Sequence, residues 1–125
     1  KANSNEQEVR CLAENIYFEA RNQSIPGQIA VALVVLNRVE HPNFPNTVCG
    51  VVKQTKYYPS GRIDLHSCQF SWYCDGKSDE PIEPCWEEIF TLAEIIIGKQ
   101  RHGPTGNVML EFEAMFTKFK DIQTS

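Results

Sequence analysis

Two carboxylates in the first periodic segment have the residue type for acid catalysis. On a helical wheel of about 100° per residue, Glu19 falls within about 20° of Leu12 and so lies on the apolar stripe. Glu14 falls well outside that stripe and is expected to face water. A carboxylate on a buried face is desolvated, which favours the protonated form that a general acid needs. The alternative for Glu19 is an ion pair with Arg21 or Arg38, or a solvated position at the helix end.

Ordered motifs surround this carboxylate. They are Ala-Glu-Asn-Ile-Tyr-Phe-Glu-Ala-Arg at 13–21, Gly-Gln-Ile-Ala-Val-Ala at 27–32, Asn-Arg-Val at 37–39, Phe-Pro-Asn-Thr-Val at 44–48 and Cys-Gln-Phe-Ser-Trp at 68–72. Over about residues 9–107 the succession resembles the SleB-like cell wall hydrolases, the family of spore cortex-lytic enzymes. The resemblance implies a small lysozyme-like, mainly helical domain that cleaves peptidoglycan glycan strands, typically as a lytic transglycosylase. It also implies that Glu19, in the Glu-Ala-Arg motif, is the catalytic acid.

This chemistry requires only one carboxylate. An ordinary glycosidase adds a second one as nucleophile or base. A lytic transglycosylase does without it, because the deprotonated acid takes the proton of the sugar's own 6-hydroxyl, which closes a 1,6-anhydro ring. The remaining loop carboxylates are expected to be solvated: Asp64, Asp75 and Asp79. The alternatives are a lysozyme-type muramidase that hydrolyses the bond, and a glycan-binding module with reduced or no turnover.

An aromatic segment at 55–84 carries several turn signals and is expected to be a long loop with room for one short hairpin. Sugars present apolar faces and rims of hydroxyl groups, so stacking rings together with amide and hydroxyl side chains suit a glycan. The residues that supply this mixture are Gln69, Phe70, Ser71, Trp72 and Tyr73. In the alternative interpretation, Phe70 and Trp72 fill the core.

Three residues of the N-terminal half are further candidates for substrate binding, each with a structural alternative. Tyr17 borders either the substrate or the core. Arg21 either steadies the Glu19 carboxylate after proton loss or caps the helix end. Asn37 either holds the substrate or Glu19, or satisfies backbone groups at a helix terminus.

The five cysteines do not reveal their connectivity from sequence alone. Cys68 and Cys74 are the pair most easily bridged, because they close a short loop; free, partly buried thiols are the alternative. No two cysteines have the close spacing typical of zinc sites, so neither a metal nor another cofactor is expected.

Helical periodicity predicts the elements that carry these residues. Helices are expected over 8–21, 28–39, 85–97 and 108–119, with a short one through Lys53. The segment 28–39 is apolar all round and is expected to be the central helix, although a buried strand pair is the competing interpretation. The expected N-caps are Asn5 or Ser4, then Ser24, then Asn46 or Thr47. Asn22 in a left-handed conformation and Gly98 are expected to end helices. The fold class expected from this periodicity is mainly α, with a long aromatic loop and room for a short β-hairpin; the resemblance implies that the helical domain is lysozyme-like.

Length and charge limit the possible partners. A chain of 125 residues forms one domain, here a single catalytic domain over 1–125. Its formal charge of −4 disfavours nucleic acid as the main partner, and its longest apolar run, Ile29–Leu36, is far too short to span a bilayer. The resemblance implies that the partner is peptidoglycan, bound by a monomer. It also implies action outside the cytoplasm (periplasm, wall or medium) or delivery by a phage.

Two departures from the family pattern are visible. Asn22 stands where the family commonly has Gly, and from Asn107 onward the chain lacks the usual aromatic-His pair. The second departure removes groups expected on the far wall of a substrate cleft, and it motivates the binding-module alternative.

Overall fold

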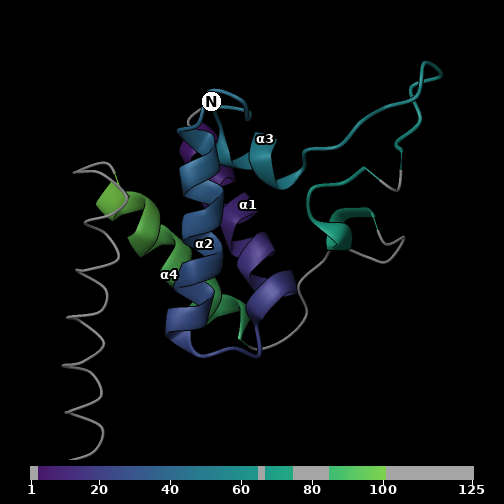
Figure 1. The fold of residues 1–125 in the computed structure, drawn as a ribbon. Coiled ribbons are helices and arrows are strands. Elements are labelled where there is room, and N and C mark those ends of the chain that lie inside the picture. Colours follow the sequence, from purple (N-terminus) through teal and green to yellow (C-terminus); the bar gives the residue numbers. More distant parts are fainter. Residues whose placement is uncertain (1–2, 65–66, 75–84, 101–125) are drawn as a thin grey trace, which may run out of the picture.

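The computed structural model describes residues 3–64, 67–74 and 85–100. Within them the chain forms four α-helices and one short 3-10 helix: α1 (Asn3–Ala20), α2 (Ile25–Val39), α3 (Val48–Val52), η1 (Ser71–Cys74) and α4 (Trp86–Gln100). The described part contains no β-strand, only one antiparallel bridge between Tyr57 and Ile63. The expected mainly α fold class is confirmed, and Figure 1 shows the arrangement.

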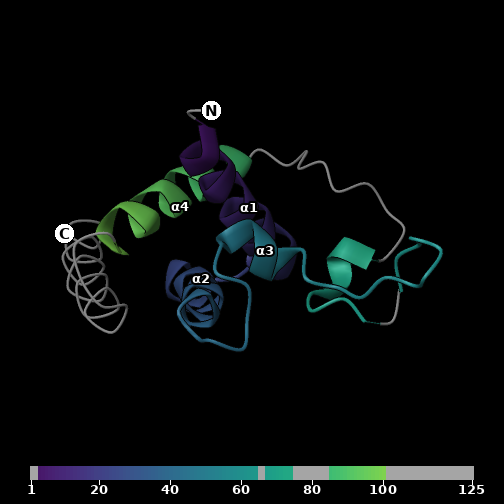
Figure 2. The same cartoon turned by 90° about the horizontal axis from the view of Figure 1, so that it is seen from above.

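The central helix of the described structure is α1. It packs against α2, α3 and α4, which surround it when the molecule is viewed from above (Figure 2). The prediction that the segment 28–39 is buried all round was wrong, because Ala30 is exposed and Val34 is 45% exposed. In α1 the polar side chain of Asn15 is completely buried. Since its neighbours lie on several sides, α1 can bury most of its surface, whereas α2 buries a single face.

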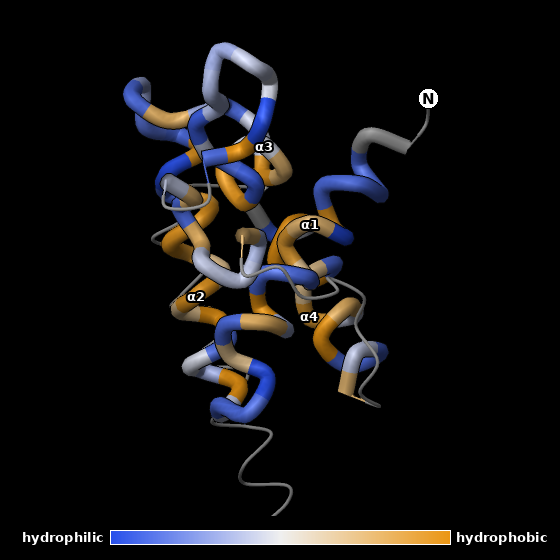
Figure 3. Tube along the Cα trace, turned by 90° about the vertical axis from the view of Figure 1, so that its right-hand side faces the viewer, coloured by the Kyte–Doolittle hydropathy of each residue, from blue (hydrophilic) through white to orange (hydrophobic). Residues whose placement is uncertain are grey.

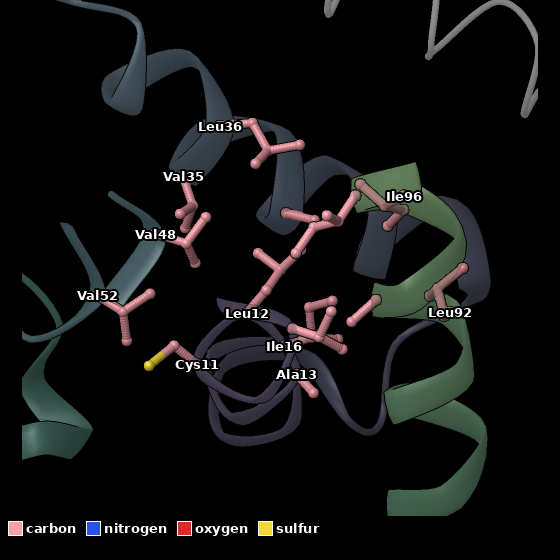
Figure 4. Close-up of a cluster of buried hydrophobic side chains, with 14 of the residues drawn as sticks. Cys11, Leu12, Ala13, Ile16, Val35, Leu36, Val48, Val52, Leu92 and Ile96 are labelled. Carbon is pink, nitrogen blue, oxygen red and sulfur yellow. The ribbon is translucent and has the colours of Figure 1, made fainter. Parts of the chain in front are cut away.

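Aliphatic side chains from all four α-helices form one core (Figure 4). Each fully buried Leu or Ile contributes roughly 1.5–3 kcal/mol relative to an exposed one. Figure 3 shows that the hydrophobic stretches of these helices lie together, while hydrophilic residues occupy the loops and helix ends. The side chains at the centre of the core are Leu12, Ile16, Val35, Leu36, Val48, Val52, Leu92 and Ile96.

Short polar side chains begin two of the helices as predicted. Ser24 caps α2 by accepting a hydrogen bond from the Gly27 amide, and Thr47 caps α3 by accepting one from the Gly50 amide. The segment 28–39 forms a helix and not a strand pair. The expected helix bounds need extension, since α1 begins at Asn3 and α4 continues past Gly98 to Gln100.

The turn between α1 and α2 is closed by a side-chain amide. Gln28 Nε2 is buried and donates to the carbonyl oxygens of Ala20 (3.2 Å) and Gln23 (3.5 Å). Asn22 does not adopt the left-handed conformation that we expected, because no non-glycine residue of the described chain has a positive φ. The Gln28 amide thus donates to carbonyl groups at the end of α1, which is the role that backbone amides play in a left-handed cap.

A short hairpin and an aromatic loop follow α3, on the side of α1 away from α4 (Figures 1 and 2). Gly61, with a φ of 92°, makes the hairpin turn. The amide of Gln69 donates to the carbonyl of Gln54 at 2.9 Å, which joins the aromatic loop to the base of the hairpin. The predicted loop with a short hairpin is therefore present in the described part; residues 75–84 of the expected loop and the helix expected at 108–119 lie outside it.

Two disulfides stabilise this arrangement. The predicted Cys68–Cys74 bridge closes the aromatic loop, and a second bridge, Cys11–Cys49, joins α1 to α3. Cys85 is the remaining free thiol. No helix of the described ranges has both the length and the hydrophobicity needed to cross a bilayer.

Candidate active site

Glu19 lies in the last turn of α1 and is exposed. The prediction that Glu19 would be buried was therefore wrong, although the helical wheel gives the side of α1 on which it lies. Glu19 shares one side of α1 with Leu12 and Asn15, within about 40°. The elements against this side contact earlier turns: Cys49 of α3 is bridged to Cys11, and Trp72 bonds Asn15. In the last turn the Trp72 ring stacks on Phe18, which lies about 100° round the helix from Glu19, and the Glu19 carboxylate reaches solvent.

The Glu19 carboxylate makes no hydrogen bond or ion pair within the described structure. Both arginines proposed as its partners lie over aromatic rings instead. The guanidinium of Arg21 lies 5.0 Å from the centroid of Tyr17, and that of Arg38 lies between the rings of Phe44 (5.3 Å) and Phe70 (5.6 Å). A structural ion pair is thereby excluded as the reason for a glutamate at this position.

The position of Glu19 is electrostatically unfavourable for the helix. The C-terminal end of a helix carries a partial negative charge, and α1 has no basic residue in its last turn to offset a carboxylate there. An unpaired anion at this end costs about 0.3–1 kcal/mol. A group that opposes stability, and that no partner compensates, is typical of a residue placed for function.

Glu14 differs from the prediction in the opposite direction. Its side chain is 12% exposed, and it forms an ion pair with Arg10 one turn earlier at 3.2 Å. Trp86, at the start of α4, lies against this side of α1: its ring is 5.6 Å from the Arg10 guanidinium and 6.0 Å from the Tyr17 ring. The start of α4 thus covers a face that the wheel assigned to solvent.

A buried hydrogen bond fixes the aromatic loop to α1. Trp72 Nε1 donates to Asn15 Oδ1 at 2.8 Å, and the Trp72 ring stacks on Phe18 at 4.7 Å. Asn15 is fully buried, and its Nδ2 has no partner. The contact places η1 beside α1 one turn before Glu19. Sequence reasoning missed Asn15; the available signal was a polar residue on the apolar side of the helix, within the motif at 13–21.

The structure divides the proposed substrate-binding residues into two groups. Tyr17 and Trp72 belong to the buried core. The others are exposed or only partly buried: Arg21, Asn37, Gln69, Phe70, Ser71 and Tyr73. In the aromatic loop, the exposed polar side chains of Gln69 and Ser71 alternate with the more buried rings, so the loop presents an amide and a hydroxyl to solvent while its rings anchor it.

Two further carboxylates in this region are engaged in the fold. Glu8 accepts hydrogen bonds from the amides of Val48 (2.7 Å) and Cys49 (2.8 Å), which stabilises the start of α3. Asp64 accepts from the hydroxyls of Ser67 (2.7 Å) and Tyr58 (3.4 Å) at the base of the hairpin. Asp75 and Asp79 lie outside the described residues. Within those residues no three acidic, Cys or His side chains converge as a metal site.

A sequence profile described as Cell Wall Hydrolase matches residues 22–119, most of the chain. The chain belongs to this family. The matched range begins just after Glu19, so the assignment of Glu19 does not come from the profile. The family membership agrees with the resemblance derived from the motifs.

Individual relatives are similar over shorter stretches. The spore cortex-lytic enzyme of Bacillus subtilis (strain 168) is 49% identical over 45 residues, 36% of this chain and 15% of the relative. That of Halalkalibacterium halodurans is 41% identical over 51 residues, 41% of this chain and 16% of the relative. The alignments with these relatives thus cover less than a fifth of their length. No solved structure is significantly similar to the chain.

A different class of protein shares one short segment. The replicative DNA helicase DnaB of Nostoc (strain PCC 7120) is 56% identical over 34 residues, which is 27% of this chain and 4% of the helicase. The shared segment is too small a part of the helicase for any of its properties to be assigned to this chain.

Proposed function

We propose that this chain cleaves the glycan strands of peptidoglycan between N-acetylmuramic acid and N-acetylglucosamine, with Glu19 as the catalytic acid. The observation that carries the proposal is the Glu19 carboxylate itself. It is exposed, has no partner among the residues that the structure describes, and occupies the unfavourable end of α1 in a member of the cell wall hydrolase family. Residues 1–125 would act as one catalytic domain and as a monomer.

The reaction that best suits these residues is that of a lytic transglycosylase. Glu19 gives its proton to the glycosidic oxygen as the bond between that oxygen and C1 of the muramic acid breaks. Positive charge develops at C1, and the 6-hydroxyl of the same sugar attacks this carbon. The Glu19 carboxylate takes the hydroxyl proton, so the acid is regenerated and a 1,6-anhydro ring closes. Because the nucleophile belongs to the substrate, no water has to be captured and oriented.

The arrangement of carboxylates supports this route over hydrolysis. A pair of carboxylates in a glycosidase is separated by about 5–9.5 Å. Glu8 shares the Glu19 side of α1 but lies about 16 Å away along the helix axis, and α3 amides occupy its oxygens. Glu14 is paired with Arg10, and Asp64 is held by two hydroxyls. None of these three is available as a second catalytic carboxylate.

The exposed parts of the site suit a sugar strand. Gln69 and Ser71 would bond hydroxyl and acetamido groups of the glycan, and Asn37 and Arg21 would contribute from the helices. Tyr17 and Trp72 would act from the core, by supporting the end of α1 and the aromatic loop. The two disulfides support a location outside the reducing cytoplasm, either as an exported protein or as one delivered to the wall by a phage.

Mass spectrometry of the products tests the proposal directly. Purified sacculi are incubated with the chain in heavy-oxygen water, and the released fragments are analysed. Transglycosylation gives 1,6-anhydromuramic acid ends, each lighter by one water than a hydrolysed end and free of the heavy isotope. Reducing ends that carry the label would instead identify a lysozyme-type muramidase.

A glycan-binding module with little or no turnover is the second candidate. The exposure of Glu19 favours it, because the described residues do not enclose this carboxylate in the water-excluding groove that the transglycosylase route favours. The same incubation distinguishes the candidates. Binding to sacculi without release of any fragment would support the module and overturn the enzyme.

A further inference from the structure

The hairpin at residues 56–64 has two chemically different faces. The Tyr58 amide donates to the Arg62 carbonyl and the Asp64 amide to the Lys56 carbonyl, both at 2.8 Å. Tyr57 and Ile63, which form the bridge between these bonds, are therefore a non-hydrogen-bonded pair with neighbouring side chains. Because side chains alternate along a strand, these two share one face. The opposite face carries Lys56, Tyr58, Arg62 and Asp64.

The apolar face offers a free ring. Tyr57 is 60% exposed, the highest fraction among the exposed large hydrophobic side chains of the described chain. It makes none of the ring contacts found elsewhere in the described structure. An exposed tyrosine beside an aliphatic residue provides a flat apolar surface with a hydroxyl at its rim, which complements the apolar face of a sugar ring.

The other face is basic and internally ordered. Arg62 lies over the Tyr58 ring at 5.6 Å, and the single acid of this face, Asp64, is occupied by the Tyr58 and Ser67 hydroxyls. Lys56 is exposed, as is Arg62. The hairpin therefore presents two cations in a chain whose formal charge is −4. This local charge complements the carboxylates of the peptide stems that peptidoglycan carries on its muramic acid residues.

We propose that this hairpin is a second peptidoglycan-binding site, separate from Glu19, in which Tyr57 stacks on a sugar ring while Lys56 and Arg62 attract stem carboxylates. The inference rests on the proposed function for the identity of the polymer. The hairpin is bonded at its base to the aromatic loop, through Gln69 and Gln54. A glycan strand bound at the hairpin therefore runs toward the aromatic loop beside α1. Binding at the hairpin raises the local concentration of the glycan at that loop.

Binding is measured apart from cleavage. The full chain carrying Glu19→Gln is sedimented with sacculi freed of teichoic acids, so that the peptide stems are the main anionic groups. We expect Tyr57→Ala in this background to weaken binding about 3- to 10-fold. Tyr57→Phe, which keeps the ring, should bind nearly as the parent does. Val34→Ala, which shortens another exposed apolar side chain (45% exposed) on α2, is the control and should have no effect.

The charged face has its own test. Lys56→Gln with Arg62→Gln should weaken binding about 2- to 10-fold at low salt, and the difference should disappear in 0.5 M salt, where the Debye length is about 4 Å. On glycan strands stripped of their stems by an amidase, the double variant should bind as the parent does. Equal binding of the parent and Tyr57→Ala, or no sedimentation of the parent, would overturn the proposal. Release of fragments from sacculi by the chain with Glu19 intact tests the proposed function independently of this binding assay.

Discussion

Replacing Glu19 by Gln separates catalysis from stability in a single variant. Gln keeps the shape and the helix propensity of Glu but cannot transfer a proton. Removal of a general acid lowers the rate about 10²–10⁴-fold or more. The structure predicts the opposite sign for stability: the variant loses an uncompensated anion from the last turn of α1, which should raise the free energy of unfolding by about 0.3–1 kcal/mol. For a domain of this size the melting temperature rises by about 1–4 °C.

The assay combines release of soluble fragments from sacculi with thermal unfolding in 0.02 and 1 M salt. Because the charge is exposed, the gain in stability should shrink in 1 M salt, where the Debye length is about 3 Å. Glu14→Gln is the matched control, since it removes a carboxylate from the same helix but breaks the pair with Arg10. It should keep turnover and lose about 0.5 kcal/mol. Wild-type turnover of Glu19→Gln would refute the assignment, and a destabilised Glu19→Gln would refute the electrostatic reasoning.

Three further predictions concern the scaffold of the site. Under denaturing, non-reducing conditions one thiol, Cys85, should react, and a count of three or five would show that a bridge is missing. In a double-mutant cycle of Asn15→Leu and Trp72→Phe, chemical unfolding should give a coupling energy of about 1 kcal/mol, and additive effects would mean that the buried hydrogen bond contributes nothing. Glu8→Gln should lower the free energy of unfolding by about 1 kcal/mol because the charge-assisted bonds to α3 are lost, whereas unchanged stability would exclude a capping role.

Local patterns predicted most of the helices, because helical periodicity and capping both depend on residues that are close together in the sequence. Ser24 and Thr47 act as caps through bonds to amides three residues later. The short spacing of Cys68 and Cys74 likewise identified their bridge. The Cys11–Cys49 bridge joins cysteines 38 residues apart, and only the packing of α3 on α1 brings them together.

Burial around the candidate site was predicted less well, because a helical wheel gives a direction and not what lies in that direction. It placed Glu19 on the same side of α1 as Leu12 and Asn15 but could not show that the aromatic loop covers Asn15 and Phe18 and leaves Glu19 exposed. The wheel predicted that Glu14 faces solvent, because residues near Glu14 in the sequence do not reveal that Trp86 packs against this side of α1. For the same reason the apolar run in α2 suggested a central helix, although Val34 is exposed.

Every residue proposed for the site around Glu19 lies within one of two covalent rings. The ring closed by Cys11 and Cys49 encloses Glu19 with Tyr17, Arg21 and Asn37, and the ring closed by Cys68 and Cys74 encloses residues 69–73. A protease that cuts the backbone once inside either ring produces a nick without releasing a fragment. Only a cut between the rings, where the exposed hairpin lies, divides the two halves of the site. The exposed hairpin is therefore the segment where a secreted protease would separate the two halves of the site. It is also the segment that we propose binds the cell wall.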